Sequence, residues 1–148
     1  MLNILKFSNL NNSVLGLVAG LCLGLSPTFA GTQPLPPLNQ DTHINQTLLS
    51  AAIGEAIRRN CGPISARLFM VFTKAMALER YARNLGYTKA EIKAFISNKA
   101  EKQRMRDETV VYLKANGVIE DQEATFCALG RAEIARNSLT GQLLRSWR

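Results

Sequence analysis

The sequence predicts an all-α protein: a compact orthogonal bundle of five to six helices that follows an N-terminal signal peptide and contains one disulfide. From Asp41 onwards, apolar residues recur every three or four positions, as they do on one face of a helix. Capping residues and glycines divide this pattern, and no stretch alternates apolar and polar residues for long enough to indicate a strand. A chain of 148 residues, 47% of them hydrophobic and 20% charged, is long enough for one globular domain.

Residues 1–30 have the order of a secretory signal peptide. Lys6 is the only charged residue in this segment, the apolar block Ser13–Leu25 follows, and small residues precede a cleavage point after Ala30. The block is short for a bilayer span, so an uncleaved anchor is the alternative. Cleavage predicts a periplasmic protein, and it removes one positive charge from the formal net charge of +7.

Two cysteines, Cys61 and Cys127, remain after this cleavage. An even number of cysteines in an exported domain predicts a disulfide between them. The alternative is a pair of unlinked thiols, of which Cys127 would be reactive at the start of a helix. The oxidising compartment favours the bridge, which would join the end of the first helix to the start of the fifth.

The first two helices follow a proline-rich lead-in. Residues 31–40 hold three of the five prolines and predict an extended segment, so the helical domain spans residues 41–148. Asp41 or the next residue caps a first helix that reaches Asn60. A second helix, with apolar residues at helical spacing from Ile64 to Leu85, has the widest apolar face. That width predicts the central element around which the others pack.

Capping residues divide the middle of the chain into two further helices. Thr88 and Glu91 stand three positions apart and form a capping box. They begin a short helix whose apolar residues between Ile92 and Ile96 should face inwards. Asn98 begins a fourth helix, whose first half is nearly all charged and predicts a solvent-exposed face with ion pairs along it.

The C-terminal quarter combines basic and apolar residues. Asp121 is expected to cap the fifth helix, and a break near Asn137 precedes a last amphipathic segment. We expect its leucines to close the core of the protein itself. The alternative is that this segment is a contact surface for an unknown protein partner or for an anionic membrane surface. The residues of this predicted contact surface are Arg136, Leu139, Leu143, Arg145, Trp147 and Arg148.

The sequence offers little for catalysis or for a cofactor. His43 is the only histidine and no CxxC or CxxCH motif occurs, so no catalytic, cofactor-binding or metal-ligating residues are predicted. The positive net charge would suit nucleic acid, but export argues against that partner. A cell-wall polymer hydrolase remains an alternative that needs two carboxylates across one cleft. The candidates would be Glu55, Glu79 and Glu133, and their spacing does not select a pair.

Four blocks of the sequence resemble a small uncharacterised family of exported alphaproteobacterial proteins, a domain of unknown function. The resemblance covers roughly residues 34–145. Its members are often encoded among genes for the respiratory NADH dehydrogenase, so the resemblance implies an accessory role beside that membrane complex. We therefore expect a non-catalytic periplasmic helical protein that binds or braces a partner. The blocks are Glu55–Cys61, Ile64–Arg67, Asn98–Lys102 and Cys127–Arg136.

Overall fold

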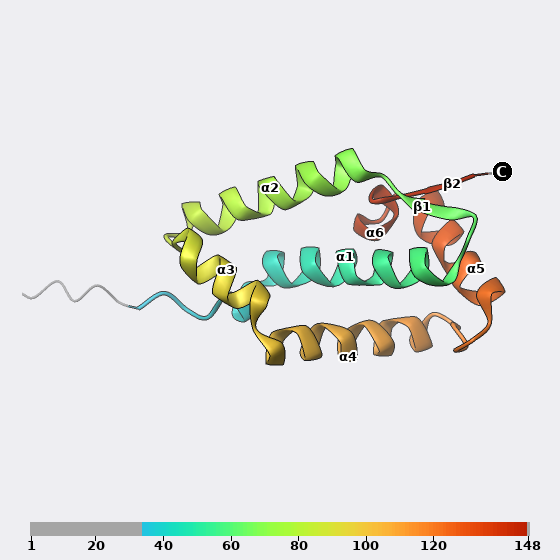
Figure 1. Cartoon of the computed structure of the whole chain (residues 1–148), viewed down its shortest axis with the longest axis horizontal. Helices are drawn as coiled ribbons and strands as arrows, with labels where there is room; N and C mark the ends of the chain where they lie inside the picture. Colours follow the sequence, from blue (N-terminus) through green and yellow to red (C-terminus); the bar gives the residue numbers. More distant parts are fainter. Residues whose placement is uncertain (1–33, 148) are drawn as a thin grey trace, which may run out of the picture. The chain divides into compact units, whose positions relative to one another are not determined.

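The computed structural model describes residues 34–147, which form six α-helices and two short strands (Figure 1). The predicted all-α class is confirmed, whereas the predicted signal peptide and Arg148 lie outside the described residues. No helix within residues 34–147 has the length and apolar character needed to cross a membrane. After a short 3₁₀-helix at Leu38–Gln40, the elements are α1 (Thr42–Asn60), β1 (Ile64–Ala66), α2 (Leu68–Asn84), α3 (Lys89–Ser97), α4 (Lys99–Ala115), α5 (Glu123–Ala135), α6 (Leu139–Gln142) and β2 (Leu144–Ser146).

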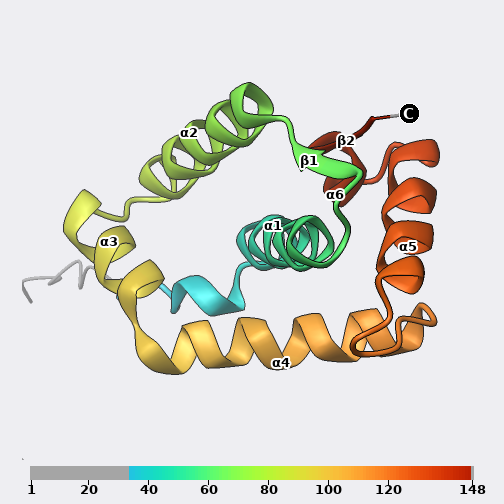
Figure 2. The ribbon, with the colours of Figure 1, turned by 45° about the vertical axis from the view of Figure 1, so that its right-hand side comes forward.

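Helix α1 lies at the centre of the domain and contacts α2, α4, α5 and α6 (Figure 2). It begins where predicted, because the Asp41 side chain accepts a hydrogen bond from the backbone N–H of Ile44 at 2.9 Å. Ile53 and Ile57 are buried on its inner side, in the main hydrophobic cluster of the domain. The predicted bounds of the first helix are therefore confirmed.

A disulfide joins Cys61, the residue that ends α1, to Cys127 in the second turn of α5, with a Cα–Cα distance of 5.2 Å. The predicted bridge is confirmed, and the alternative of two unlinked thiols is wrong. Gly130 lies one turn after Cys127, against α1 and β1. A Cβ atom at this position would stand 2.3 Å from Ile64 Cδ1 and 2.7 Å from Ile57 Cγ2. The absence of a side chain therefore lets α5 approach α1 closely beside the bridge.

Helix α2 is peripheral, so the prediction of a central second helix is wrong. Ile64 belongs to β1 rather than to the helix, and α2 begins only at Leu68. Ala82 is its one buried residue, while Leu68 and Leu85 are exposed although the sequence pattern placed them in the core. A wide apolar face shows that a helix has apolar surface to cover, but it does not show what covers it.

The C-terminal segment does not form the predicted amphipathic helix. Helix α6 has only four residues, and the chain then extends into β2, which pairs antiparallel with β1 so that Ile64 lies opposite Ser146. Leu143 and Leu144 are buried, as the expected closure of the core requires. Three-residue strands that pair across 80 positions leave no local periodicity from which they could be predicted.

The remaining helices begin close to their predicted positions. The capping box of Thr88 and Glu91 is present at the start of α3, and the Asn98 side chain caps α4. Two details differ from the prediction. Ile96 is 52% exposed rather than inward-facing. Asp121 does not cap α5, because it adopts a left-handed conformation (φ 60°) and the helix begins after Gln122.

Candidate functional site

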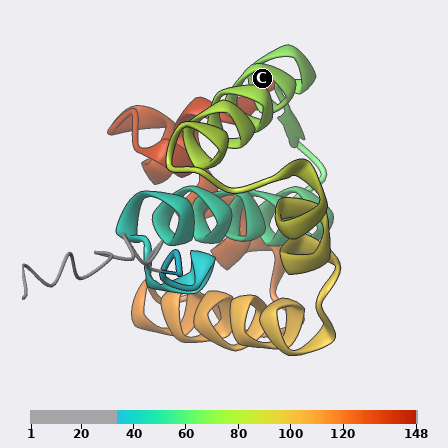
Figure 3. The ribbon, with the colours of Figure 1, turned by 90° about the vertical axis from the view of Figure 1, so that its left-hand side faces the viewer.

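Helices α2 and α4 lie on either side of α1 (Figure 3), and adjoining cavities follow α1 between them. A cavity of about 500 Å³ lies among α1, α3 and α4, and one of about 380 Å³ lies among α1, α2 and α3. They share Leu48, Phe95 and Ile96 as lining residues. A third cavity, of about 730 Å³, shares Ala51 and Val71 with the second and reaches β1. We call these three adjoining cavities together the α1 groove.

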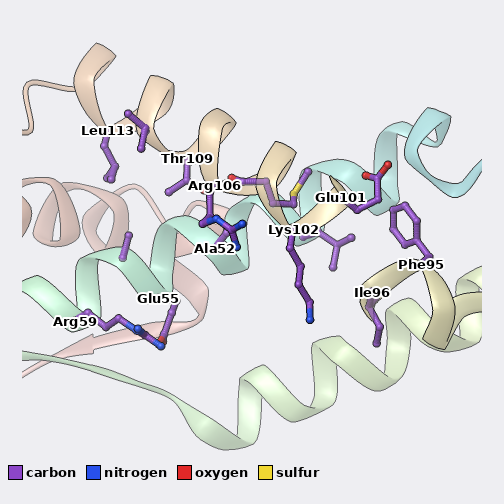
Figure 4. Close-up of a pocket in the computed structure, with 14 residues that line it drawn as sticks. Ala52, Glu55, Arg59, Phe95, Ile96, Glu101, Lys102, Arg106, Thr109 and Leu113 are labelled. Atoms are coloured by element: carbon purple, nitrogen blue, oxygen red, sulfur yellow. Dashed lines mark hydrogen bonds and ion pairs between the residues drawn. The ribbon is translucent and has the colours of Figure 1, made fainter. Parts of the chain in front are cut away.

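Mostly apolar side chains from four helices line the α1 groove. Three alanines, together with Leu48 and Glu55, form its floor on α1. Figure 4 shows Lys102 and Arg106 of α4 extending over the floor, with Ile96 of α3 at one end. The floor residues are Leu48, Ala51, Ala52, Glu55 and Ala56, and the walls include Val71, Phe72 and Met76 of α2 and Met105 and Val110 of α4.

The start of α2 carries a stripe of exposed apolar side chains beside the groove. Leu68, Phe72 and Met76 follow one another at steps of four residues and therefore share one face of the helix. Phe69 lies next to them and is 79% exposed, while Phe72 is 64% exposed. We call these four residues the α2 stripe. Contiguous exposed apolar surface of this kind marks interaction sites on soluble proteins.

Some charged groups of the groove have ion-pair partners within residues 34–147 and others do not. Glu55 accepts hydrogen bonds from Arg58 and Arg59, which lower the pKa of its carboxyl group to about 2. This carboxylate is therefore ionised at neutral pH and already has two cationic partners. On the opposite wall, Arg106 donates to the neutral side chain of Gln103, and within residues 34–147 no carboxylate forms an ion pair with Lys102 or Arg106.

A second polar cluster surrounds Glu133, which is 1% exposed. Tyr112, Arg136 and Ser138 all donate hydrogen bonds to its carboxylate. Burial raises the pKa of Glu133, but the hydrogen bonds from Ser138, Tyr112 and Arg136 outweigh it, so that the pKa lies below its ordinary value. Glu133 forms an ion pair with Arg136 and lies in the interior of the domain, not on the helix surface. All of its acceptor atoms are used within the fold.

The three candidate carboxylates for hydrolysis do not meet. Glu55 and Glu79 line different cavities, and Glu133 lines none of the four cavities found among residues 34–147. The sulfur atoms of Cys61 and Cys127 lie near the Glu123 carboxylate, within 4.8 Å of one another. They are bonded to each other and supply no thiolate for a metal ion, and Glu123 accepts a hydrogen bond from the backbone N–H of Gly62 at 2.9 Å.

The predicted C-terminal contact residues are distributed over different parts of the domain. Arg136 is held by Glu133, Leu143 is buried, and Leu139 is exposed on α6. Arg145 and Trp147 do come together, since the guanidinium carbon lies 4.3 Å from the centre of the indole ring. Both also donate hydrogen bonds to the Ser65 hydroxyl on the neighbouring strand. These side chains therefore help to fix β2 against β1.

Sequence reasoning missed the α1 groove, although one signal for it was present. The apolar residues of α2 cover a wider arc than contact with one neighbouring helix needs. A helix with this much apolar surface can be either a central helix or one with an exposed docking face. Periodicity cannot distinguish these two cases, because it describes the helix and not its neighbours.

Comparisons with known proteins place the chain in a family but do not give it an activity. Neither the curated proteins nor the solved structures show a match to this sequence. One family model matches, and it extends over residues 36–145, which include the α1 groove, the α2 stripe and both bridged cysteines. The chain belongs to this family of unknown function, DUF5333.

Proposed function

We propose that this protein is a non-catalytic, exported helical domain that binds a partner protein through the α1 groove and the α2 stripe. The observation that carries the proposal is the exposure of Leu68, Phe69 and Phe72 at the start of α2. Burying a fully exposed side chain of this size contributes roughly 1.5–3 kcal/mol. Contact with a partner would therefore gain apolar burial that the domain alone leaves unused.

Two features support export to the periplasm. Residues 1–30 have the pattern of a signal peptide, and the Cys61–Cys127 disulfide is of the kind that persists in oxidising compartments. The resemblance described above makes the respiratory NADH dehydrogenase the first membrane complex to test as the partner. In this role the domain would brace a neighbouring subunit without taking part in electron transfer.

Affinity isolation from solubilised membranes tests the proposal with a matched pair of variants. The double variant Phe69→Ser and Phe72→Ser removes apolar surface from the α2 stripe. The control, Val111→Ser and Ile119→Ser, removes two exposed apolar side chains that line none of the described cavities. We expect a stoichiometric partner to be recovered with the native chain and the control and to be lost with the first variant.

Both variants should retain the thermal stability of the native chain, because all four side chains are already exposed. Loss of the partner would then reflect a lost contact and not a lost fold. Recovery of the native protein alone would contradict the proposal, and so would equal recovery of the partner with all three proteins. Binding to liposomes that is abolished by the first variant would instead assign the α2 stripe to a membrane surface.

A further inference from the structure

We propose that the occupant of the α1 groove is an amphipathic helix with an acidic polar face, supplied by the partner protein. This inference rests on the proposed function and names the class of partner segment. The groove follows α1, whose 19 residues span about 28 Å. A helix of about 18 residues could lie along this length, in the manner of other helices bound in apolar grooves.

The shape of the groove fits a helix. Ala51, Ala52 and Ala56 on the floor leave room for a close approach, since each presents only a methyl group. Phe72 on the α2 wall and Val110 on the α4 wall are both exposed and stand on opposite sides of this floor. An incoming apolar ridge would pack between these walls as helices pack in a bundle.

An acyl chain would cover less of the exposed surface than a helix. The first cavity alone has the volume of an ordinary small-ligand pocket. However, the exposed apolar surface extends beyond it to Phe69, which lines none of the four described cavities, and to Leu68, which lines only the third. A ligand confined to the first cavity would leave both side chains in water, whereas a helix that follows the groove can contact them.

The charge of the groove selects an acidic occupant. Three cations line the groove without an ion-pair partner among residues 34–147: Lys102 and Arg106 on α4, and Lys74 on α2. The negative charge of Glu55 is neutralised by its two arginines. Glu79 is the remaining carboxylate on the α2 side without an ion pair within the same residues. Opposite charge across an interface sets partner choice and speeds association.

The same charges disfavour two occupants from this chain itself. In a second copy, α2 carries Lys74, Arg80 and Arg83 against a single acid, so packing of that helix into the groove would bring cations together. Residues 1–33 contain no Asp or Glu and would leave the cations of the groove unpaired. An acidic helix from another protein satisfies both the apolar walls and the cationic rim.

The test uses two synthetic amphipathic peptides of about 18 residues with the same leucine face, one with glutamate and one with lysine on the polar face. Fluorescence anisotropy of the labelled peptides reports their binding to the purified, oxidised protein. We expect the glutamate peptide to bind at least about tenfold more tightly than the lysine peptide, with an advantage that falls as salt is raised.

Charge reversal then locates the site. The variant Lys102→Glu with Arg106→Glu should weaken binding of the glutamate peptide by about tenfold or more. The control, Lys93→Glu with Lys99→Glu, changes the net charge equally at exposed positions that line none of the described cavities, and should change binding by less than about twofold. Equal effects of the two variants would overturn the inference.

Three other results would also overturn it: no binding of the glutamate peptide, saturable binding of sodium laurate in its place, or dimerisation of the protein through Phe72. These results are distinguishable from failure of the proposed function. If affinity isolation still recovers a partner that depends on Phe69 and Phe72, the proposed function stands and only the acidic helix is wrong. If no such partner is recovered, both are wrong.

Discussion

Glu133 is the residue whose surroundings restrict it most. Its carboxylate is buried, ionised and saturated by hydrogen bonds from Tyr112, Arg136 and Ser138. A second constraint comes from Gly141, where a Cβ atom would stand 2.0 Å from the backbone oxygen of Glu133. The cluster therefore holds α6 against α5 and positions the chain that leads into β2. Its polar groups stabilise the fold and leave no acceptor free for a substrate.

The first prediction concerns the variant Glu133→Gln. We expect it to lower the free energy of unfolding by about 1–3 kcal/mol at pH 7, because a charge-assisted network becomes partly unsatisfied. The pKa of Glu133 is lower in the folded protein than its ordinary value of 4.5. Its stabilising effect is therefore complete above about pH 4.5 and is lost as the pH falls through the folded-state pKa.

Chemical denaturation at several pH values measures this dependence. The difference between the native protein and Glu133→Gln should be constant near neutral pH and should shrink in acid. The exposed Glu120→Gln provides the control and should show no such difference. A difference that grows as the pH falls below 4.5 would contradict the assignment.

The second prediction compares two glycines inside helices. Gly130→Ala should destabilise the protein by about 1–3 kcal/mol, because its methyl group would overlap Ile64 and Ile57. Gly54→Ala should be neutral or stabilising, because its nearest neighbours would be 3.8 Å away and alanine favours the helix. Thermal unfolding of the two variants measures the contrast, and equal shifts of the melting temperature would show that α5 does not approach α1 as closely as described.

At the scale of elements, local signals predicted where helices begin and long-range packing decided where they lie. Asp41, Thr88 and Asn98 cap their helices as predicted, because a cap is a contact within one turn. The role of α2 was mispredicted, because burial depends on the neighbours that the fold places beside a helix. The groove could not be predicted for the same reason, since its floor and walls come from four different helices.

The third prediction separates the two interpretations of the C-terminal segment. Leu144 is 3% exposed and packs in the main cluster, whereas Leu139 is 44% exposed on α6. Leu144→Ala should therefore cost about 2–5 kcal/mol of stability and Leu139→Ala less than about 1 kcal/mol. Urea denaturation distinguishes them. Similar small losses would instead support the alternative of an amphipathic contact segment outside the core.

For the whole molecule, the disulfide is the strongest long-range constraint. It joins residues 66 positions apart and connects the central helix α1 to α5. By the chain-entropy argument, a closed loop of this length stabilises the folded state by about 4 kcal/mol. The fold class and this pairing were both predicted from the sequence, because the two cysteines that remain after the predicted cleavage permit one intramolecular bridge.

The fourth prediction follows from this constraint. Reduction of the disulfide, or the double variant Cys61→Ala and Cys127→Ala, should lower the free energy of unfolding by about 4 kcal/mol. Urea unfolding with and without reductant measures the loss, with the alanine variant as a control that should not respond to reductant. Equal stability of the oxidised and reduced protein would contradict the assigned role of the bridge.

The central claim is that a partner protein covers the α2 stripe in the cell. Site-specific photo-cross-linking in intact cells tests it most directly, with the photoreactive residue placed at Phe69 and, as a control, at the similarly exposed Val111 of α4. We expect one discrete adduct with another protein from position 69 and none from position 111. No protein adduct from position 69, or the same adducts from both positions, would contradict it.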